Sequence, residues 1–208
     1  MKLAAIILAA GRSRRFGSAD KLLADLCGDH VVGWTARAIL DAGFDDVVVV
    51  TGADDASRRA ALAGLALRLV INAEPSDGQG RSIASGVASL SADCDGALIV
   101  PADMPALTPA MVKRLAAAFR DGAGRLVTHF VIDGAPRPPV IWPRALFAEL
   151  IALDGDRSGR HVLARHAGIA QGLALTDDEV WRLDDVDTPV DLAALASRLV
   201  TAGDRPAP

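Results

Sequence analysis

The chain has 208 residues, of which 51% are hydrophobic and 23% are charged, and its formal net charge at pH 7 is -4. This length and composition suit one well-buried domain and exclude a disordered or fibrous protein. The negative charge argues against a protein that binds nucleic acid or a membrane surface, because both depend on a broad field of positive charge. The two cysteines are far apart in the sequence, so we expect free thiols in a reducing compartment.

Short apolar runs alternate with longer segments of helical period through the first 119 residues. The predicted strand and helix pairs are, in chain order, 4–8 with 32–40, 47–51 with 54–62, 67–71 with 81–90, and 97–100 with 109–119. This alternation is typical of βα units on a mainly parallel sheet. The strands at 47–50 and 97–100 are apolar throughout, as expected where helices cover both faces of a sheet. We therefore predict a three-layer α/β fold.

The pattern changes after residue 122. LVTHFVIDG predicts a strand that ends in a turn, and PRPPVIWP predicts a short strand before a helix that begins near Pro143. We expect these strands to form a small β-rich insertion. The segment VWRLDDVDTPVDLAALASRLV predicts a short strand, an acidic turn and a final helix, with Thr188 as its N-cap and Pro189 at its first position. We expect residues 1–202 to form a single domain and residues 203–208 to be a flexible tail.

The N-terminal segment MKLAAIIL is predicted to be a strand rather than a secretory signal, because arginines follow it instead of a cleavage site. No apolar run approaches the roughly 18 residues that are needed to span a bilayer. We therefore expect a soluble, cytoplasmic protein.

The first predicted strand leads into the glycine-bearing loop LAAGRSRRFGSADK, residues 8–21, which holds three arginines and Lys21. The loop is neither a Walker A motif nor a G-x-G-x-x-G fingerprint, because its glycines and lysine have other spacings. Gly11 allows the backbone to turn tightly and approach a ligand, and the cations can contact several negative charges at once. The loop therefore favours a binding site for an anion.

Three further stretches contain candidate functional residues. Asp103 lies in VPADMP, directly beyond the strand at 97–100, where ligands bind in open α/β sheets. The run DDVDTP, residues 184–189, supplies favourable charge to a helix N-terminus. Beside Asp103 and the basic loop it fits better as part of a Mg²⁺ site, since Mg²⁺ takes carboxylates together with substrate phosphates. GQGRSIASG, residues 78–86, could bind an anion or the edge of a base at a helix start, or be a simple loop-to-helix transition.

Together, LAAGRSRRFG, GQGRSIASG, PADMP and DVDTPVDL resemble the MobA/MocA-like nucleotidyltransferases, and within them the molybdenum cofactor cytidylyltransferase branch. FAELIALDGDRSGRHVL also resembles a segment of that branch, so the resemblance spans nearly the whole chain. It implies a Rossmann-like nucleotide-diphospho-sugar transferase fold. The implied reaction is transfer of a nucleotidyl group from a nucleoside triphosphate to a terminal phosphate on an acceptor, with release of pyrophosphate.

The resemblance implies a role for each candidate site residue. The nucleotide-binding residues would be Leu8, Ala9, Ala10, Gly11, Arg12, Ser13, Lys21, Gly80 and Ser82. The catalytic residues would be Lys21, Arg15 and Asp103. The residues that hold Mg²⁺ would be Asp103 and Asp187, with Asp185 as a less certain neighbour. The residues that face the acceptor would be Arg137, Asp156 and Arg160.

The resemblance also implies the substrates and partners. Ala10 in LAAG indicates CTP, since a second glycine at that position accompanies GTP use in the family. The acceptor would be of molybdopterin type, with transient contact to a molybdenum hydroxylase or its chaperone. The branch has Gly-His-Pro or Gly-Asn-Pro where this chain has Arg137-Pro138-Pro139, so the acceptor could differ. The alternatives are GTP as donor, a sugar or alcohol phosphate as acceptor, a dinucleotide-binding oxidoreductase, and a non-catalytic cofactor carrier.

Overall fold

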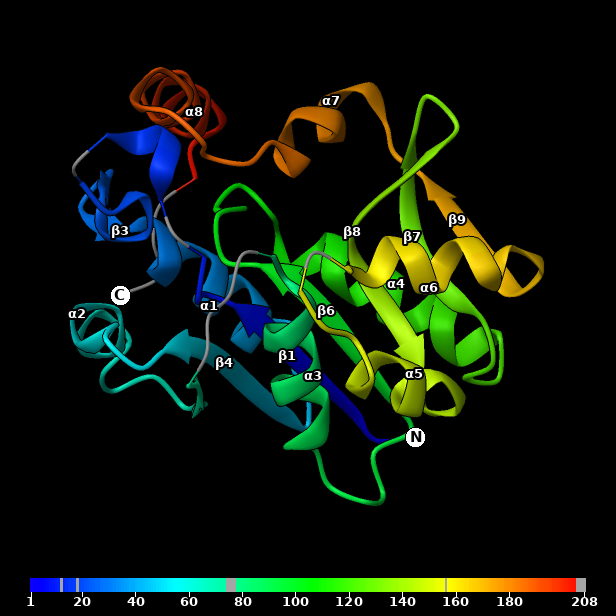
Figure 1. The fold of residues 1–208 in the computed structure, drawn as a ribbon. Coiled ribbons are helices and arrows are strands. Elements are labelled where there is room, and N and C mark those ends of the chain that lie inside the picture. The colour runs from blue at the N-terminus through cyan, green and yellow to red at the C-terminus, as the bar shows by residue number, and fades with distance from the viewer. Residues whose placement is uncertain (12, 18, 74–77, 156, 205–208) are drawn as a thin grey trace.

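The computed structural model describes residues 1–11, 13–17, 19–73, 78–155 and 157–204. A seven-stranded sheet in the order β5-β4-β1-β6-β8-β7-β9 runs through the molecule (Figure 1). Its strands are β1 (Leu3–Leu8), β4 (Asp46–Gly52), β5 (Arg68–Asn72), β6 (Gly96–Pro101), β7 (Val127–Ile132), β8 (Ala135–Pro143) and β9 (Ala170–Ala174). A separate small hairpin is formed by β2 (Asp25–Leu26) and β3 (Asp29–His30).

Helices connect most of the strands. The α-helices are α1 (Val31–Asp41), α2 (Ala56–Ala61), α3 (Gly80–Ala88), α4 (Pro109–Asp121), α5 (Phe147–Ile151), α6 (Gly159–Arg165), α7 (Asp177–Val180) and α8 (Pro189–Ala202). Single turns of 3-10 helix are formed by Arg14–Phe16, Lys21–Leu23, Arg144–Leu146, Ala167–Ile169 and Trp181–Leu183. None of the helices in the described ranges combines the length and apolar character that crossing a membrane requires.

The helices cover both faces of the sheet and form two hydrophobic cores. Ala5 and Ile7 of β1 belong to the core that includes residues of α1, α4 and α8. Ile6, which points to the opposite face, belongs to the core that includes residues of α3, α5 and α6 (Figure 1). Because successive side chains of a strand alternate between faces, an all-apolar strand serves both cores. The predicted three-layer α/β fold is confirmed.

Strand direction changes between β6 and β8. The strands β5, β4, β1 and β6 are parallel, whereas β8 pairs antiparallel with both β6 and β7. Ile99 of β6 lies opposite Val140, so the earlier residues of β8 lie beyond the carboxyl end of β6. The predicted β-rich region is present as β7 and β8, which extend the main sheet.

One predicted element was wrong. Trp181–Leu183 form a turn of 3-10 helix instead of a short strand. The helix α7 begins at a capping box in which Thr176 and Glu179 bond each other's backbone N–H, and the helical turn continues directly into this segment. The final helix is as predicted, with Thr188 as N-cap and Pro189 at its first position.

The predicted tail begins where α8 ends. Gly203 caps the helix in the left-handed conformation, with a φ of 75°. The Asp204 carboxylate lies 2.8 Å from Nη1 of Arg182, which ties this residue back to the domain. Residues 205–208 lie outside the described part of the chain, so the predicted flexibility of the tail stays a prediction.

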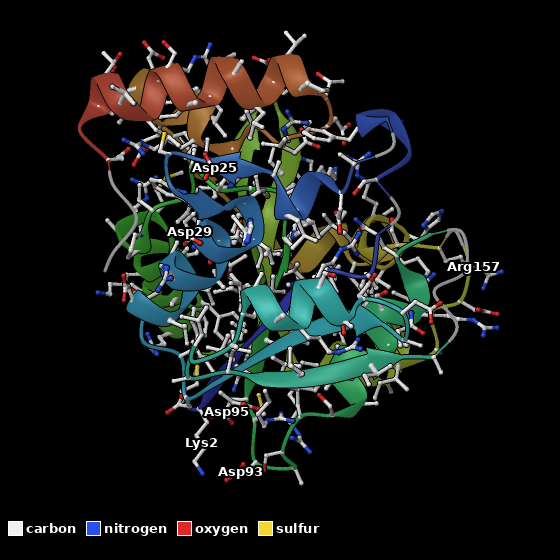
Figure 2. The ribbon with its side chains drawn as sticks, turned by 90° about the vertical axis from the view of Figure 1, so that its left-hand side faces the viewer. Lys2, Asp25, Asp29, Asp93, Asp95 and Arg157 are labelled. Carbon is white, nitrogen blue, oxygen red and sulfur yellow. The ribbon has the colours of Figure 1, made fainter. Side chains whose placement is uncertain are left out.

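Aspartate carboxylates bind the residues at the amino ends of the central strands. The backbone N–H of Lys2 donates to the Asp95 carboxylate at 2.7 Å, and the Lys2 ammonium pairs with Asp93 (Figure 2). The N–H of Leu3 donates to the Asp45 carboxylate at 2.8 Å. The carboxyl ends of the same parallel strands lie at the opposite edge of the sheet, where the predicted site residues gather.

Candidate active site

The loop that follows β1 starts inside the sheet. The N–H of Ala9 donates to the Val50 carbonyl at 2.8 Å, and the N–H of Ala102 donates to the Leu8 carbonyl at 3.1 Å. Leu8 and Ala9 are therefore fixed between β4 and β6. At Gly11 the chain reaches the surface, and a Cβ there would meet no atom within 4 Å. The space beside this backbone can accept a ligand.

Lys21 lies between two carboxylates from distant parts of the chain. Its Nζ is 2.6 Å from Oδ2 of Asp103 and 2.7 Å from Oδ1 of Asp187. The guanidinium of Arg15 is 2.7 Å from the other oxygen of Asp187, although the Arg15 side chain is 78% exposed. The structure thus brings together the four residues predicted to act on the phosphates and the metal.

Backbone contacts bring the two acidic segments to the same place. The N–H of Val186 donates to the carbonyl of Asp103 at 2.9 Å, which ties the 184–189 run to the loop after β6. From α1, the hydroxyl of Thr35 donates to the carbonyl of Ala102 at 3.0 Å. The position of Asp103 is therefore held from two sides.

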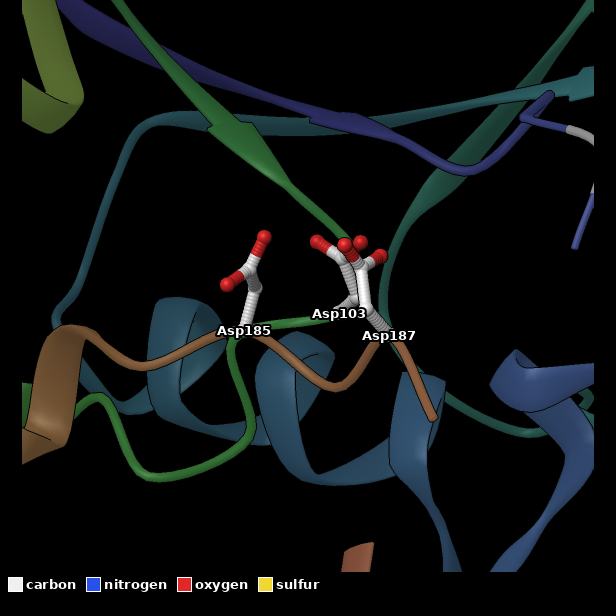
Figure 3. Close-up of side chains that lie close together, drawn as sticks. All are labelled: Asp103, Asp185 and Asp187. Atoms are coloured by element: carbon white, nitrogen blue, oxygen red, sulfur yellow. The ribbon is translucent and has the colours of Figure 1, made fainter. Parts of the chain in front are cut away.

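The carboxylates of Asp103, Asp185 and Asp187 form one cluster. One oxygen of each lies within 4.8 Å of the others, and in Figure 3 the side chains of Asp103 and Asp187 point in the same direction, with Asp185 to one side. Oδ1 of Asp103 is buried and has no hydrogen-bond partner among the described residues. A buried oxygen without a partner is costly unless a ligand satisfies it. Carboxylate oxygens are also the ligands that hard divalent cations prefer, so these residues fit a Mg²⁺ or Mn²⁺ ion.

The charges in this cluster shift the protonation equilibria. Burial acts to lower the pKa of Lys21, but the adjacent carboxylates of Asp103 and Asp187 outweigh it and hold the pKa above its ordinary value. The hydrogen bond from Lys21 lowers the pKa of Asp187. Burial, followed by the charge of Asp103, raises the pKa of Asp185. The charge of Lys21 acts in the opposite direction on the pKa of Asp185 and does not outweigh these two effects.

A cleft of about 400 Å³ opens beside the cluster, at the carboxyl ends of β1 and β6. Leu8 and Pro101 line it on the side of the parallel strands, and Asp185 joins it to the carboxylate cluster. The opposite wall carries Trp142 and two of the predicted acceptor residues, Arg137 and Arg160. The third, Asp156, lies outside the described residues, as does Arg12.

The start of α3 forms another wall of the cleft. Gly80 is buried against Asp154, Gly155 and Arg157, and its N–H donates to the Gly155 carbonyl at 3.3 Å. A Cβ on Gly80 would lie 2.6 Å from the Arg157 carbonyl oxygen, so only glycine fits this close approach. Ser82 is also buried, and its hydroxyl accepts a hydrogen bond from the Asn72 amide at 3.1 Å. Gly80 and Ser82 are therefore held by contacts within the protein, and the residues of this segment that line the cleft are Gln79 and Ile83. That Gly80 and Ser82 approach the base stays a prediction.

The remaining loop residues contact one another. The Ser13 hydroxyl donates to Oδ1 of Asp20 at 2.9 Å, and Ala10 is buried with 7% of its surface exposed. Asp20 also receives the guanidinium of Arg58 from α2. The sequence prediction missed Asp20 and Arg58. No motif marks either residue; the available signal was an aspartate directly before Lys21, and its buried partner lies 38 residues away in the chain.

Comparison with known proteins shows the family to which the chain is similar. The family model described as a MobA-like NTP transferase domain matches residues 5–172. The chain is 30% identical over 212 residues to a Haloferax mediterranei protein named Probable molybdenum cofactor guanylyltransferase, covering 94% of this chain and 93% of that protein. It is 30% identical to the Nicotine blue oxidoreductase of Paenarthrobacter nicotinovorans, covering 88% and 91%. It is 32% identical over 151 residues to the Bifunctional protein GlmU of Maricaulis maris, of which it spans 32% of the length.

Solved structures share the fold. A nucleotidyl transferase from Methanothermobacter superposes with a TM-score of 0.82 at 24% identity, over 97% of this chain and 99% of that one. The manganese complex of Rv0371C from Mycobacterium tuberculosis superposes with a TM-score of 0.75 at 24% identity, over 95% and 99%. At this level of identity the likeness establishes the fold.

Proposed function

The chain belongs to the MobA-like NTP transferase family and is a nucleotidyltransferase, and we propose that it transfers CMP from CTP to the terminal phosphate of molybdopterin with release of pyrophosphate. The observation that carries this proposal is the contact of Lys21 with Asp103 and Asp187, beside Asp185, which lines the cleft. Cations and carboxylates at one point suit a triphosphate that arrives with a divalent metal.

The proposed reaction needs no catalytic histidine or cysteine. An oxygen of the acceptor phosphate forms a bond to the α-phosphorus of the nucleotide, and the bond from that phosphorus to the pyrophosphate oxygen breaks, with the electron pair leaving on pyrophosphate. Because a phosphate is already ionised at neutral pH, no general base is required. Lys21 and Arg15 would bind the phosphate oxygens on which negative charge grows, so catalysis rests on positioning and charge neutralisation.

The metal in this proposal is Mg²⁺, held by Asp103 and Asp187 with Asp185 as a third carboxylate. The buried, unpartnered oxygen of Asp103 supports this role. A divalent ion bound there would neutralise phosphate charge during transfer. The manganese complex of Rv0371C, a protein of the same fold, is further support for a divalent ion.

The choice of nucleotide depends on Ala10. Its buried methyl group lies in the segment that would run along the nucleotide, and by family resemblance an alanine at this position favours CTP over GTP. GTP is the second candidate donor, because the relative from Haloferax mediterranei is named as a guanylyltransferase.

The acceptor would lie against Arg137, Arg160 and Trp142. The two guanidinium groups suit an anionic acceptor, and the indole of Trp142 with the flanking prolines offers an apolar wall for its body. A molybdopterin-type phosphate meets both requirements, and a sugar or alcohol phosphate meets the first. Contact with a molybdenum hydroxylase or its chaperone belongs to the same proposal.

A second function from another class is favoured by one relative. The Nicotine blue oxidoreductase aligns with 88% of this chain, so a redox function on the same fold is the competing proposal. The two predict different products, because only the transferase releases pyrophosphate. A non-catalytic carrier of the cofactor would release none.

The test is to incubate the protein with Mg²⁺, molybdopterin and either CTP or GTP, and to measure pyrophosphate. We expect release with CTP. The Asp103→Asn variant should turn over about 100-fold more slowly or worse, because a carboxylate that would hold the metal at the reacting phosphates becomes a neutral amide, while its nucleotide affinity changes far less. Asp93→Asn is the matched control, since Asp93 is an exposed carboxylate at the other end of β6.

Each other outcome would overturn one part of the proposal. Pyrophosphate with GTP but not CTP would make GTP the donor. No pyrophosphate with either nucleotide would remove molybdopterin as acceptor, and oxidation of NADPH with a quinone-type dye as electron acceptor would then favour the redox function. Unchanged turnover in Asp103→Asn would remove the metal role of Asp103.

A further inference from the structure

The side chain of Arg58 is a buried cation next to the nucleotide loop. Arg58 lies on α2, and only 5% of the residue is exposed. One nitrogen, Nη1, donates to the carbonyl of Ala9 at 2.6 Å. Nε and Nη2 donate to the two carboxylate oxygens of Asp20 at 2.6 and 3.1 Å. The guanidinium therefore joins both ends of the loop that runs from β1 to Lys21.

Asp20, which is bound by Arg58, also accepts hydrogen bonds from the part of the loop that would bind the triphosphate. Its Oδ1 accepts from the Ser13 hydroxyl at 2.9 Å and from the Leu22 N–H at 3.0 Å. The Ser13 hydroxyl oxygen in turn accepts the backbone N–H of Lys21 at 3.2 Å. A continuous set of hydrogen bonds thus leads from Arg58 to the backbone that carries the Lys21 ammonium.

Burying a guanidinium costs free energy unless its N–H groups are hydrogen-bonded and its charge is paired. The buried position of Arg58 therefore indicates that its contacts have a role. Two charge-assisted bonds in a fork fix the orientation of Asp20 as well as its distance. Although burial acts to raise the pKa of Asp20, the hydrogen bonds and charge of Arg58 hold it below its ordinary value. Asp20 therefore stays ionised at neutral pH and can accept the hydrogen bonds from the loop.

We propose that Arg58 is a positioning residue for nucleotide binding, which acts through Asp20 and the Ala9 carbonyl to hold the loop and Lys21 in place for the triphosphate. Arg58 itself touches no substrate in this proposal. The inference rests on the proposed nucleotide site, and it does not depend on which base or acceptor is used.

The test compares nucleotide binding in matched variants. Arg58→Met removes the fork and keeps an unbranched side chain of similar length. Arg59→Met is the control, because Arg59 is the next residue of α2 and donates to the carbonyls of Gly52 and Ala53 instead. Affinity is measured calorimetrically with Mg²⁺ and no acceptor, using the triphosphate and the monophosphate of the base that the wild type binds.

We expect Arg58→Met to bind the triphosphate about tenfold more weakly or worse, because charge-assisted contacts that order the phosphate-binding loop are lost. Its affinity for the monophosphate should change less, and Arg59→Met should stay within about twofold of the wild type. Arg58→Lys keeps the charge but cannot form the fork, so its loss should be intermediate. A merely structural role would lower the melting temperature without separating the two nucleotides.

If Arg58→Met fails to fold, the same binding test is made with Asp20→Asn. It preserves the shape of the side chain and removes the acceptor charge, so it should show the same selective loss for the triphosphate. Equal triphosphate affinity in the wild type and in the folded variants would overturn the positioning role. A wild type that binds neither CTP nor GTP would instead count against the proposed function, so the two failures are distinguishable.

Discussion

Lys21 makes the same kind of contact with Asp103 and Asp187 that a divalent cation would make. Its Nζ donates to one oxygen of each carboxylate, and Arg15 contacts the remaining oxygen of Asp187. In the proposed site Lys21 must turn from the carboxylates to the phosphates when the metal and the nucleotide bind. Lys21 therefore competes with a metal ion that binds alone.

Replacing Lys21 should then strengthen the binding of the metal alone. We expect Lys21→Met to bind Mn²⁺ about tenfold more tightly than the wild type in the absence of nucleotide, since a competing positive charge is removed from the two carboxylates. The same variant should bind the nucleoside triphosphate more weakly. Calorimetric titration with Mn²⁺ checks this, and Lys113→Met, on the exposed face of α4, is the control. Unchanged or weaker Mn²⁺ binding in Lys21→Met would contradict the competition.

At the scale of elements, the contact between α3 and the segment before α6 joins two walls of the cleft. Gly80 packs so closely on this segment that a Cβ would lie 2.6 Å from the Arg157 carbonyl oxygen and 3.0 Å from that of Gly155. The segment that follows carries Ser158 and Arg160, which line the cleft. A displacement of the backbone at Gly80 would therefore also displace the wall that is proposed to bind the acceptor.

Gly80→Ala should destabilise the protein and disturb that wall. We expect the free energy of unfolding to fall by about 1–3 kcal/mol, because backbone atoms must move to admit the methyl group. Gly168→Ala is the control, since a Cβ at Gly168 meets nothing within 4 Å. Urea denaturation at equilibrium measures both variants. Equal stability in the two variants would show that the backbone at Gly155 and Arg157 moves away without a loss of stability.

The elements that could be predicted from the sequence are those with a strong local pattern. Apolar runs marked β1, β4 and β6 to within a few residues, and Thr108 with Pro109 marked the start of α4. The strand predicted near Trp181 was wrong because a local capping box at Thr176 continues a helical turn through it. Asp103 beyond the end of β6 and the acidic run before α8 indicated the carboxylate cluster. Arg58 could not be found, because its role comes from tertiary contacts with Ala9 and Asp20 that no spacing in the sequence records.

At the scale of the whole molecule, the two hydrophobic cores share the same strands. Trp34 of α1 lies in one core and Trp142 of β8 in the other, while β1, β4 and β6 contribute side chains to both. Neither core can lose its packing without exposing the sheet that supports the other. This arrangement supports the proposal that residues 1–202 are a single domain.

A single domain should unfold in one cooperative transition. We expect tryptophan fluorescence and far-UV circular dichroism to give the same urea midpoint. The sharper form uses Trp142→Phe, which leaves Trp34 and Trp181 as probes of one core, and the double variant Trp34→Phe/Trp181→Phe, which leaves Trp142 as the probe of the other. Fluorescence is compared with circular dichroism within each variant. Separate midpoints in either variant would indicate that the two cores unfold independently.

The walls of the cleft come from separate stretches of the chain, so mutations can change one wall without changing the other. Leu8, Pro101 and the start of α3 come from the first half, whereas Arg137, Trp142 and Arg160 come from the second. Under the proposed assignment, mutations in the second stretch change the acceptor that binds, while the first stretch continues to bind the nucleotide. The contact at Gly80 with Gly155 limits this freedom, because new second-half sequences must still present a backbone that glycine can approach. Diversification is thus expected to concentrate on β8 and α6, and to spare the turn between α5 and α6.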